Sequence, residues 1–410
     1  METSRQRFIL AIAIALAIGF GVGVFVSRSS TFLSTPGNQI VTNQDLGKPQ
    51  EVDFSIFWKT WSLLKEKHVD RESLDYQKMI YGAIKGLVGS INDPYTSFFE
   101  PAQSKKFQEE ISGTFGGVGI EIGKRNGTLT VISPLKDTPA FRAGVKAGDR
   151  ILKIDEKTTV DMTTEEAVSL IRGKKGTKVI LNITSDGTES KDVTLVRETI
   201  KVPTIELAYM QSGNNKVAYL AIFSFNQIVD REFEAAAEEI LKSEADSIVL
   251  DLRNNPGGLL DSAQYISGWF LDPNQVAVIE EFYDGRKTEL RTDGNALLKR
   301  YPVIILTNGG SASASEILAG ALHDNRKITI VGEKTFGKGS VQQIEELDKG
   351  ASLKITIAKW LTPAGVSISD KGIEPNIKVE LDSKKIEDGT FEVGIQGKDP
   401  QLDKALELLR

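Results

Sequence analysis

Cysteine is absent from all 410 residues of this chain. The absence excludes disulfides, thiolate zinc sites and a cysteine nucleophile, because each of these needs a cysteine sulfur. It suits an oxidising compartment outside the cytoplasm without requiring one.

Histidine is nearly as scarce, since only His68 and His323 occur. A zinc protease of the H-E-x-x-H type needs two histidines one helical turn apart, and the sequence has no such pair. A Ser-His-Asp triad would have to use one of the two. On a helix the neighbours His323 and Asp324 would point about 100° apart, so neither would relay a proton to the other. If the chain is a serine hydrolase, we expect its base to be another residue.

The chain has 50 Lys and Arg and 56 Asp and Glu, which gives a net charge of −6. Neither sign of charge is therefore in large excess. Proteins whose main partner is nucleic acid usually carry a basic surface. We therefore expect no nucleic-acid partner. The length predicts two or three domains, each with its own core.

The first long apolar run, Phe8 to Val26, contains no charged residue and follows Arg5 and Arg7. A helix of about 20 apolar residues spans a bilayer, and the exit V-F-V-S-R-S-S lacks the small-residue pattern of a cleavage site. We expect residues 1–26 to be an uncleaved anchor, with a cleaved signal as the alternative. Basic residues before the run predict a single-pass protein of the cell membrane whose bulk is extracytoplasmic, or a secreted protein if the segment is cleaved.

Residues 27–50 are rich in Ser, Thr, Asn, Gly and Pro, which is typical of a linker. In residues 51–105 the pattern becomes helical, and a second helix is expected at 76–91. Apolar residues of the first helix recur on one stripe, namely Phe54, Phe57, Trp58, Trp61 and Leu64. We interpret the stripe as ordinary core, with a homodimer face as the sharper alternative.

Residues 106–199 show the pattern of a small β-rich domain with one helix. Strand-like runs occur at 118–122, 128–132, 149–154, 179–183 and 192–196. The helix, 164–172, follows a capping box of Thr163 and Glu166, and Gly173 is expected to end it in a left-handed cap. The turn from Gly116 to Ile120 would offer backbone N–H groups to a carboxylate, although a simple tight turn explains it equally.

Residues 200–380 alternate strand and helix signals, which predicts an α/β domain. Strands are expected at 217–223, 247–252, 276–282, 303–306, 328–331 and 353–357, and helices at 230–241, 259–270 and 314–323. Residues 381–410 read as a polar tail with a short helical end at 400–409.

Three serines, Ser311, Ser313 and Ser315, alternate with alanines where a strand turns into a helix. Many hydrolases present a nucleophile at such a turn, and the start of a helix favours negative charge there. Ser313 with Glu316 also fits a capping box, which needs no catalysis. Spacing alone leaves both interpretations open.

Lys338 lies between two glycines downstream of the next strand. To accept a proton near neutral pH it must be neutral, and therefore poorly solvated. Gln342 would steer the amine if the two side chains share a face; an exposed lysine is the plain alternative. The segment from Gly332 also nearly matches the phosphate loop G-x-x-x-x-G-K-[ST], but Gly339 replaces the hydroxyl that binds magnesium.

A further turn, D-L-R-N-N-P-G-G, spans Asp251 to Gly258 between a strand and a helix. The backbone N–H of Gly257 or Gly258 would suit an oxyanion. A helix-entry turn would need the same glycines.

Together with the stretch S-P-L-K-D-T-P-A-F-R-A-G-V-K-A-G-D-R-I-L, residues 106–199 resemble a PDZ domain. The resemblance implies that a four-residue loop holds the C-terminal carboxylate of a peptide, namely Gly117, Val118, Gly119 and Ile120. The peptide would add as a strand beside the helix, with Val168 and Ile171 lining the groove. Arg172 is either a charge contact or a solvated surface residue.

Four ordered motifs, D-L-R-N-N-P-G-G, S-A-S-A-S-E-I, G-E-x-T-F-G-K-G-x-V-Q and T-P-A-G-V-S-I-S-D-K-G-I-E-P, resemble the carboxyl-terminal processing proteases over residues 52–380. The resemblance implies a mixed-sheet α/β protease domain (residues 200–380) of the ClpP/crotonase type, a PDZ domain and an N-terminal helical segment. It also implies roles for five residues of the site: nucleophile Ser313, general base Lys338, positioning residue Gln342, and oxyanion amides of Gly258 and Ala314.

Two positions outside the motifs' chemistry also bear on the resemblance. Asp324 matches a position where the family carries an acidic residue, and we expect it to be structural. Asn376 stands where the family usually has an aspartate, so a local contact is expected to differ.

We therefore predict a membrane-anchored serine endopeptidase with a Ser/Lys dyad and with no metal or cofactor. It would cleave extracytoplasmic proteins near their C-termini. The expected partners are protein substrates with apolar tails, the membrane, a second copy of the chain and an activating adaptor. The alternatives are a catalytically inactive PDZ scaffold that binds protein C-termini and a phosphate-loop ATPase.

Overall fold

The computed structural model describes residues 52–125, 127–135, 137–185, 189–381 and 391–410. The expected anchor and linker lie outside these residues. None of the described helices is both long and apolar enough to cross a bilayer. The chain divides into two compact units after Leu87.

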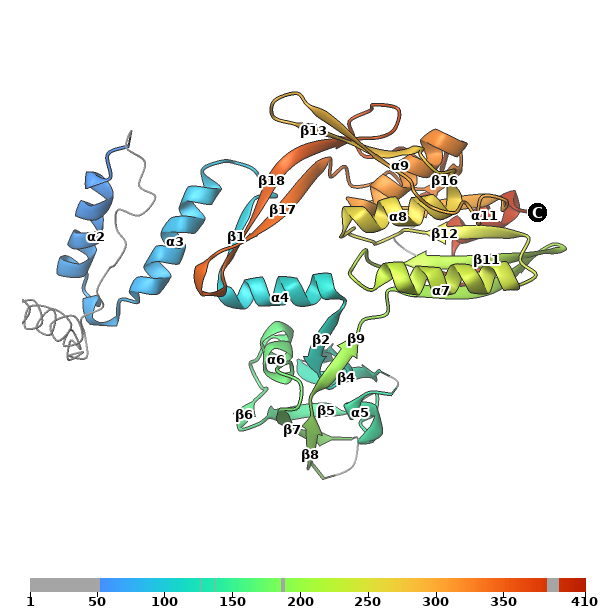
Figure 1. Ribbon diagram of the computed structural model, residues 1–410. Coiled ribbons are helices and arrows are strands. Elements are labelled where there is room, and N and C mark those ends of the chain that lie inside the picture. Colours follow the sequence, from blue (N-terminus) through green and yellow to red (C-terminus); the bar gives the residue numbers. More distant parts are fainter. Residues whose placement is uncertain (1–51, 126, 136, 186–188, 382–390) are drawn as a thin grey trace, which may run out of the picture. The chain divides into compact units, whose positions relative to one another are not determined.

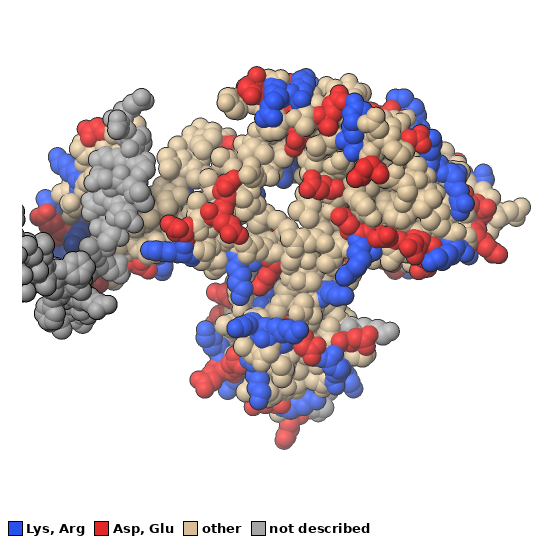
Figure 2. Space-filling view, viewed as in Figure 1, with Lys and Arg blue, Asp and Glu red and all other residues tan. Residues whose placement is uncertain are grey.

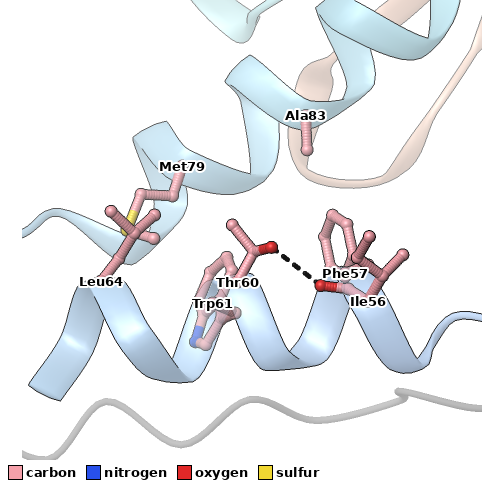
Figure 3. A pocket seen from close by; sticks show the side chains of 7 residues that line it. All are labelled: Ile56, Phe57, Thr60, Trp61, Leu64, Met79 and Ala83. Carbon is pink, nitrogen blue, oxygen red and sulfur yellow. Dashed lines mark hydrogen bonds between the residues drawn. The ribbon is translucent and has the colours of Figure 1, made fainter.

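The first unit contains helix α2 (Ser55–Lys67), the short helix η1 (Arg71–Ser73) and most of α3 (Tyr76–Gly89). No residue of α2 is buried, and Ile56 is 74% exposed. Figure 3 shows the apolar side chains that line a groove between α2 and α3, namely Ile56, Phe57, Trp61, Leu64, Met79 and Ala83. Within the stripe, Phe54, Trp58 and Trp61 are half-buried, and Phe57 and Leu64 are 37% and 41% exposed. In one copy of the chain the stripe is thus less buried than the core interpretation predicts. The homodimer stays a prediction that a mass measurement in solution would decide.

In the second unit a six-stranded sheet has the order β10-β11-β12-β15-β16-β19 (Figure 1). Its strands are β10 (Ile205–Ser212), β11 (Asn215–Ile222), β12 (Ser247–Asp251), β15 (Val303–Thr307), β16 (Thr329–Gly332) and β19 (Ile377–Lys378). β10 runs antiparallel to β11, and the other neighbours are parallel. The carboxyl ends of β12, β15 and β16 therefore meet along one edge of the sheet.

Helices cover both faces of this sheet because its strands are apolar on both sides. Alternate residues of β11 such as Leu220 pack with helices α7 (Val229–Lys242), α8 (Leu260–Phe270) and α9 (Ala314–Arg326). The residues between them, such as Tyr219, pack with α11 (Pro400–Leu408). The C-terminal segment, expected as a polar tail with a helical end, is thus part of the core.

A buried ion-pair network ties α11 to the end of β12. Arg253 donates to Asp251 at 2.6 Å and to Asp399 at 2.7 Å, and the three side chains are at most 4% exposed. Asp399 also accepts from the backbone N–H of Gln401 and Leu402 and so caps α11. Because Arg253 begins the turn toward Gly257, the last helix holds one wall of the candidate site.

A second sheet contains β1, β18, β13 and β14 in that order, and β17 also pairs with β18. The bounds are β1 (Ser97–Phe99), β13 (Val276–Phe282), β14 (Lys287–Arg291), β17 (Ser340–Glu346) and β18 (Ser352–Leu361), with η2 (Asp348–Gly350) between the last two. The stretch after Lys338 is thus a strand. A phosphate loop needs a helix at this point, so the geometry argues against the ATPase alternative.

The predicted small β-rich domain is confirmed and follows helix α4 (Pro101–Ser112). Its elements are β2 (Thr114–Gly117), β3 (Ile120–Arg125), β4 (Thr128–Pro134), α5 (Pro139–Arg142), β5 (Arg150–Ile154), β6 (Lys157–Thr158), α6 (Thr164–Ile171), β7 (Lys178–Thr184), β8 (Lys191–Val196) and β9 (Glu198–Lys201). The capping box of Thr163 and Glu166 is present.

The predicted left-handed cap at Gly173 is wrong, because α6 ends with Arg172 in an extended conformation. Glycine is needed there for a close approach instead. A Cβ on Gly173 would lie 2.8 Å from the guanidinium of Arg197, and its N–H donates to the carbonyl of Gly116.

Acidic and basic side chains are interspersed over the face shown in Figure 2. This face therefore presents no extended field of one sign, in keeping with the nearly balanced composition.

We expect Asp399→Ala to lower the free energy of unfolding by about 3–5 kcal/mol, because it leaves Arg253 buried with one partner fewer. Burial alone would raise the pKa of Asp399, but the hydrogen bonds and charge of Arg253, together with backbone N–H donors, lower it. The stabilisation is thus present above the unfolded pKa of about 3.9 and is lost as the pH falls through the lower folded pKa. Urea unfolding at several pH values measures both effects. Glu407→Gln in the exposed pair with Lys404 is the control, and equal losses in the two variants would contradict the prediction.

Candidate active site

Three loops that leave the carboxyl ends of β12, β15 and β16 meet in one cavity of about 360 Å³. Ligands of open α/β sheets commonly bind at such an edge. The cavity brings together four of the predicted site residues, namely Ser313, Lys338, Gln342 and Gly258. Apolar neighbours, Phe225, Leu260, Ile317, Val341 and Trp360, form much of the remaining wall.

The structure distinguishes the three serines of the turn. Ser311 donates its hydroxyl to the carbonyl of Leu252 at 2.8 Å, and Ser315 donates to that of Asn255 at 2.9 Å; both are buried. Ser313 lines the cavity, and its hydroxyl donates no hydrogen bond to any residue that the structure describes. Its backbone has φ 56° and ψ −117°, a strained conformation of the kind that accompanies function.

The glycine turn after β12 lies against Ser313. A Cβ on Gly257 would lie 2.6 Å from Cβ of Ser313 and 2.8 Å from the backbone nitrogen of Ala314, so no larger residue fits. The N–H of Gly257 is occupied by Asn255. Within the described ranges the N–H groups of Gly258 and Ala314 have no acceptor, and Ala314 opens α9, where intrahelical acceptors are lacking. The lack of a described acceptor is compatible with the oxyanion role expected for these two amides, which stays a prediction.

Lys338 is held by close backbone packing, as its flanking glycines predict. A Cβ on Gly337 would lie 2.8 Å from the backbone of Gly372, and one on Gly339 would lie 2.2 Å from the hydroxyl of Ser369. Burial, together with the charge of Lys354, lowers the pKa of Lys338. Its Nζ lies 5.5 Å from the ring centre of Tyr95. A partly desolvated amine with a lowered pKa is what a lysine base requires.

Gln342 lines the same cavity, but its side-chain amide forms a hydrogen bond with a residue other than Lys338. Its Nε2 donates to the hydroxyl of Ser340 at 2.8 Å. The described residues include no hydrogen bond between Gln342 and Lys338. The steering role of Gln342 stays a prediction.

Glu316 is the residue whose importance the sequence patterns missed. It forms the predicted capping contact, because its Oε2 accepts from the N–H of Ser313 at 2.9 Å. The same carboxylate accepts from the N–H of Gly337 at 2.8 Å, the N–H of Lys338 at 3.0 Å and the hydroxyl of Thr335 at 2.5 Å. Burial raises the pKa of Glu316, and these four donors oppose that effect. One buried carboxylate thus joins the serine turn to the lysine loop.

The PDZ-like loop lies at the junction of β2 and β3. Gly119 has φ 73°, and a Cβ there would lie 2.3 Å from Thr138, so only glycine fits. Val118 and Ile171 are buried in the core of this domain. The cation–π contact of Arg172 with Phe115, at 3.9 Å, and its 4.0 Å approach to Glu109 place it at the end of α6 nearest to α4.

The two positions outside the motifs have structural partners. Asp324 accepts from the N–H of Ala364 at 2.9 Å. Asn376 accepts from the N–H of Ile330 at 2.8 Å, so its amide supplies an acceptor that an aspartate would also supply.

We expect Glu316→Gln to lower the free energy of unfolding by about 1–3 kcal/mol. Each carboxylate oxygen accepts from at least one backbone N–H, so the new NH₂ group must face a donor in either orientation. Thr335→Ser keeps the hydroxyl and is the matched control, with a smaller loss. Urea unfolding of the three proteins measures the difference; a Gln variant as stable as wild type would refute this account of the carboxylate.

Comparison with known proteins agrees with this geometry. The profile of Peptidase family S41 matches residues 216–379, and that of the PDZ domain matches residues 106–184. The chain is 36% identical over 356 residues to the carboxy-terminal processing protease CtpA of Bacillus subtilis, covering 87% of this chain and 75% of that protein. It is 36% identical over 324 residues to CtpB of the same organism, covering 78% of this chain and 67% of that protein.

A solved structure assigned to the S41 proteases, from Bacteroides fragilis, has a TM-score of 0.54. The match covers 85% of this chain and 96% of that chain at 18% identity, which supports the fold alone. From the curated relatives and the two profiles it follows that this chain belongs to peptidase family S41, as a carboxy-terminal processing serine protease that carries a PDZ domain.

Proposed function

We propose that this protease works through a Ser/Lys dyad in which Ser313 is the nucleophile and Lys338 the general base. The observation that supports the proposal is the difference in hydrogen bonding among the three serines. Two hydroxyls donate to backbone carbonyls, whereas that of Ser313 donates to no residue that the structure describes and lies in the cavity that Lys338 also lines. His323, which lies within α9, bonds the carbonyl of Ile328 through its Nδ1 and does not line the cavity.

The chemistry then follows in balanced steps. Neutral Lys338 takes the hydroxyl proton as Oγ of Ser313 bonds to the peptide carbonyl carbon. The resulting oxyanion lies between the N–H groups of Gly258 and Ala314. Protonated Lys338 returns its proton to the leaving amine as the C–N bond breaks, which leaves an acyl-enzyme. Water hydrolyses the ester, again with Lys338 accepting a proton and Ser313 recovering one.

The apolar wall of the cavity supports cleavage beside small or medium apolar side chains, since such a surface gains by excluding water. We propose that the PDZ domain binds the substrate's C-terminal carboxylate at Gly117, Val118, Gly119 and Ile120, with the tail added as a strand. The enzyme would then cut proteins near apolar tails. An activating adaptor remains part of this proposal.

We also propose that the protease is held at the cell membrane with its bulk extracytoplasmic. The support is the uncharged run Phe8 to Val26 after Arg5 and Arg7. In cells that make the full chain, the protein is expected in the membrane fraction, and external protease should degrade it in cells whose cytoplasmic marker survives. Protection from external protease in intact cells, with digestion only after lysis, would reverse the orientation.

We expect Ser313→Ala and Lys338→Arg to lower kcat at least roughly a thousandfold on an unstructured protein with an apolar C-terminus. Arginine stays protonated and has no base function. In wild type, kcat/KM should fall as the pH drops through the lowered pKa of Lys338, because protonation removes the base.

Ser315→Ala is the control, because it removes a neighbouring hydroxyl that is used only for structure. It should retain turnover. Cleavage that survives in Ser313→Ala would overturn the dyad. Binding of the tail without cleavage by wild type would favour the inactive-scaffold alternative.

A further inference from the structure

A second lysine lines the cavity that holds Ser313 and Lys338. Lys354 lies in β18, opposite Ile344 of β17 on one side and Ser97 of β1 on the other. Residues directly opposite on paired strands have side chains on the same face. Because Ile344 also lines the cavity, Lys354 reaches it from the second sheet. The dyad mechanism gives this lysine no task.

The ammonium of Lys354 is fixed in place without an ion pair. Its Nζ lies 5.5 Å from the ring centre of Phe99 and 5.8 Å from that of Phe107. In the part of the chain that the structure describes, no carboxylate forms an ion pair with it. Asp93 attracts it from a distance, while that carboxylate accepts from the hydroxyl of Thr96 at 2.6 Å. Burial lowers the pKa of Lys354, while Asp93 and the two aromatic faces act against this effect by stabilising the cation.

The surroundings of Lys338 favour its charge less. Glu316 on α9 is the acidic group that attracts it, but both oxygens of Glu316 are shared among four hydrogen bonds. Tyr95 offers a single ring. Glu110 of α4 lines the cavity, and Asp370 lies in the loop packed on Gly337.

We propose that Lys354 is a positioning residue for catalysis, whose fixed positive charge in the cavity favours the neutral, proton-accepting form of Lys338. The inference rests on the proposed role of Lys338 as the base. Two cations in a poorly solvated site oppose each other's protonation, and a lysine base is activated in this way when a second cation stands nearby. The lowered pKa of Lys338, caused first by burial and then by Lys354, agrees with this assignment.

The test is the pH dependence of kcat/KM in variants that differ in charge at this position. Lys354→Gln and Lys354→Met remove the charge, and the methionine keeps an apolar stem between the two rings. Lys354→Arg keeps the charge. Lys359→Gln removes an exposed charge from the same strand and is the matched control. Thermal unfolding of each variant shows that it is folded at the assay temperature.

Loss of the Lys354 charge should move the acid limb of the profile to higher pH. Near neutral pH kcat/KM should fall roughly two- to tenfold, with recovery in alkaline buffer, which is the size expected for one screened charge. Lys354→Arg should leave the acid limb where wild type has it, and Lys359→Gln should change neither the limb nor the rate.

Other outcomes overturn the inference. A loss that is equal at every pH, whether in kcat or in KM, would assign Lys354 to packing or to substrate contact. An unmoved acid limb in both the Gln and the Met variant would exclude electrostatic coupling. If Lys338 is not the base, Lys338→Arg retains turnover irrespective of the residue at position 354. Failure of the dyad can therefore be distinguished from failure of this inference.

Discussion

The carboxylate of Glu316 is the contact on which the candidate site depends. A buried carboxylate is unfavourable unless it is well hydrogen-bonded, and this one accepts four hydrogen bonds. Its donors include the backbone N–H groups of Ser313 and Lys338, which belong to two different loops of the candidate site. Its place in the first turn of α9 adds the favourable end of the helix dipole. Ser313 and Lys338, the proposed nucleophile and base, lie on different loops, and Glu316 hydrogen-bonds the backbone of both.

The sheet beneath the site explains why the loops meet at all. Neighbouring parallel strands end at the same edge, so segments far apart in the sequence emerge side by side. Glycines then permit approaches that a Cβ would block, as at Gly257 against Ser313. On the other side of the turn, Arg253 is fixed by Asp399 at the start of the last helix. The C-terminal helix thus helps to hold the turn that carries Gly257 and Gly258.

The cavity combines an apolar wall with two lysines that lack ion-pair partners among the described residues. This arrangement suits a nucleophile whose base must be neutral, because low solvation and a second positive charge both disfavour protonation of Lys338. The PDZ domain supplies the other requirement of a carboxy-terminal processing protease, a surface for protein substrates. Chemistry and recognition therefore reside in separate parts of one chain.

The sequence by itself determined the fold class and the order of the PDZ and protease domains, and its motifs marked Ser313 and Lys338 as candidates for the dyad, because periodicity, turn glycines and family motifs are local patterns. It also gave the capping boxes, which depend on a spacing of three residues. Only the tertiary structure decided which serine hydroxyls donate to backbone carbonyls, that α11 belongs to the core, that Glu316 hydrogen-bonds two loops of the site, and that Lys354 lines its cavity. Each of these depends on contacts between segments distant in the chain, and Gly173 was mispredicted because its neighbour, Arg197, is such a contact. The spacing of residues along the sequence does not indicate which side chains the folded sheet brings together.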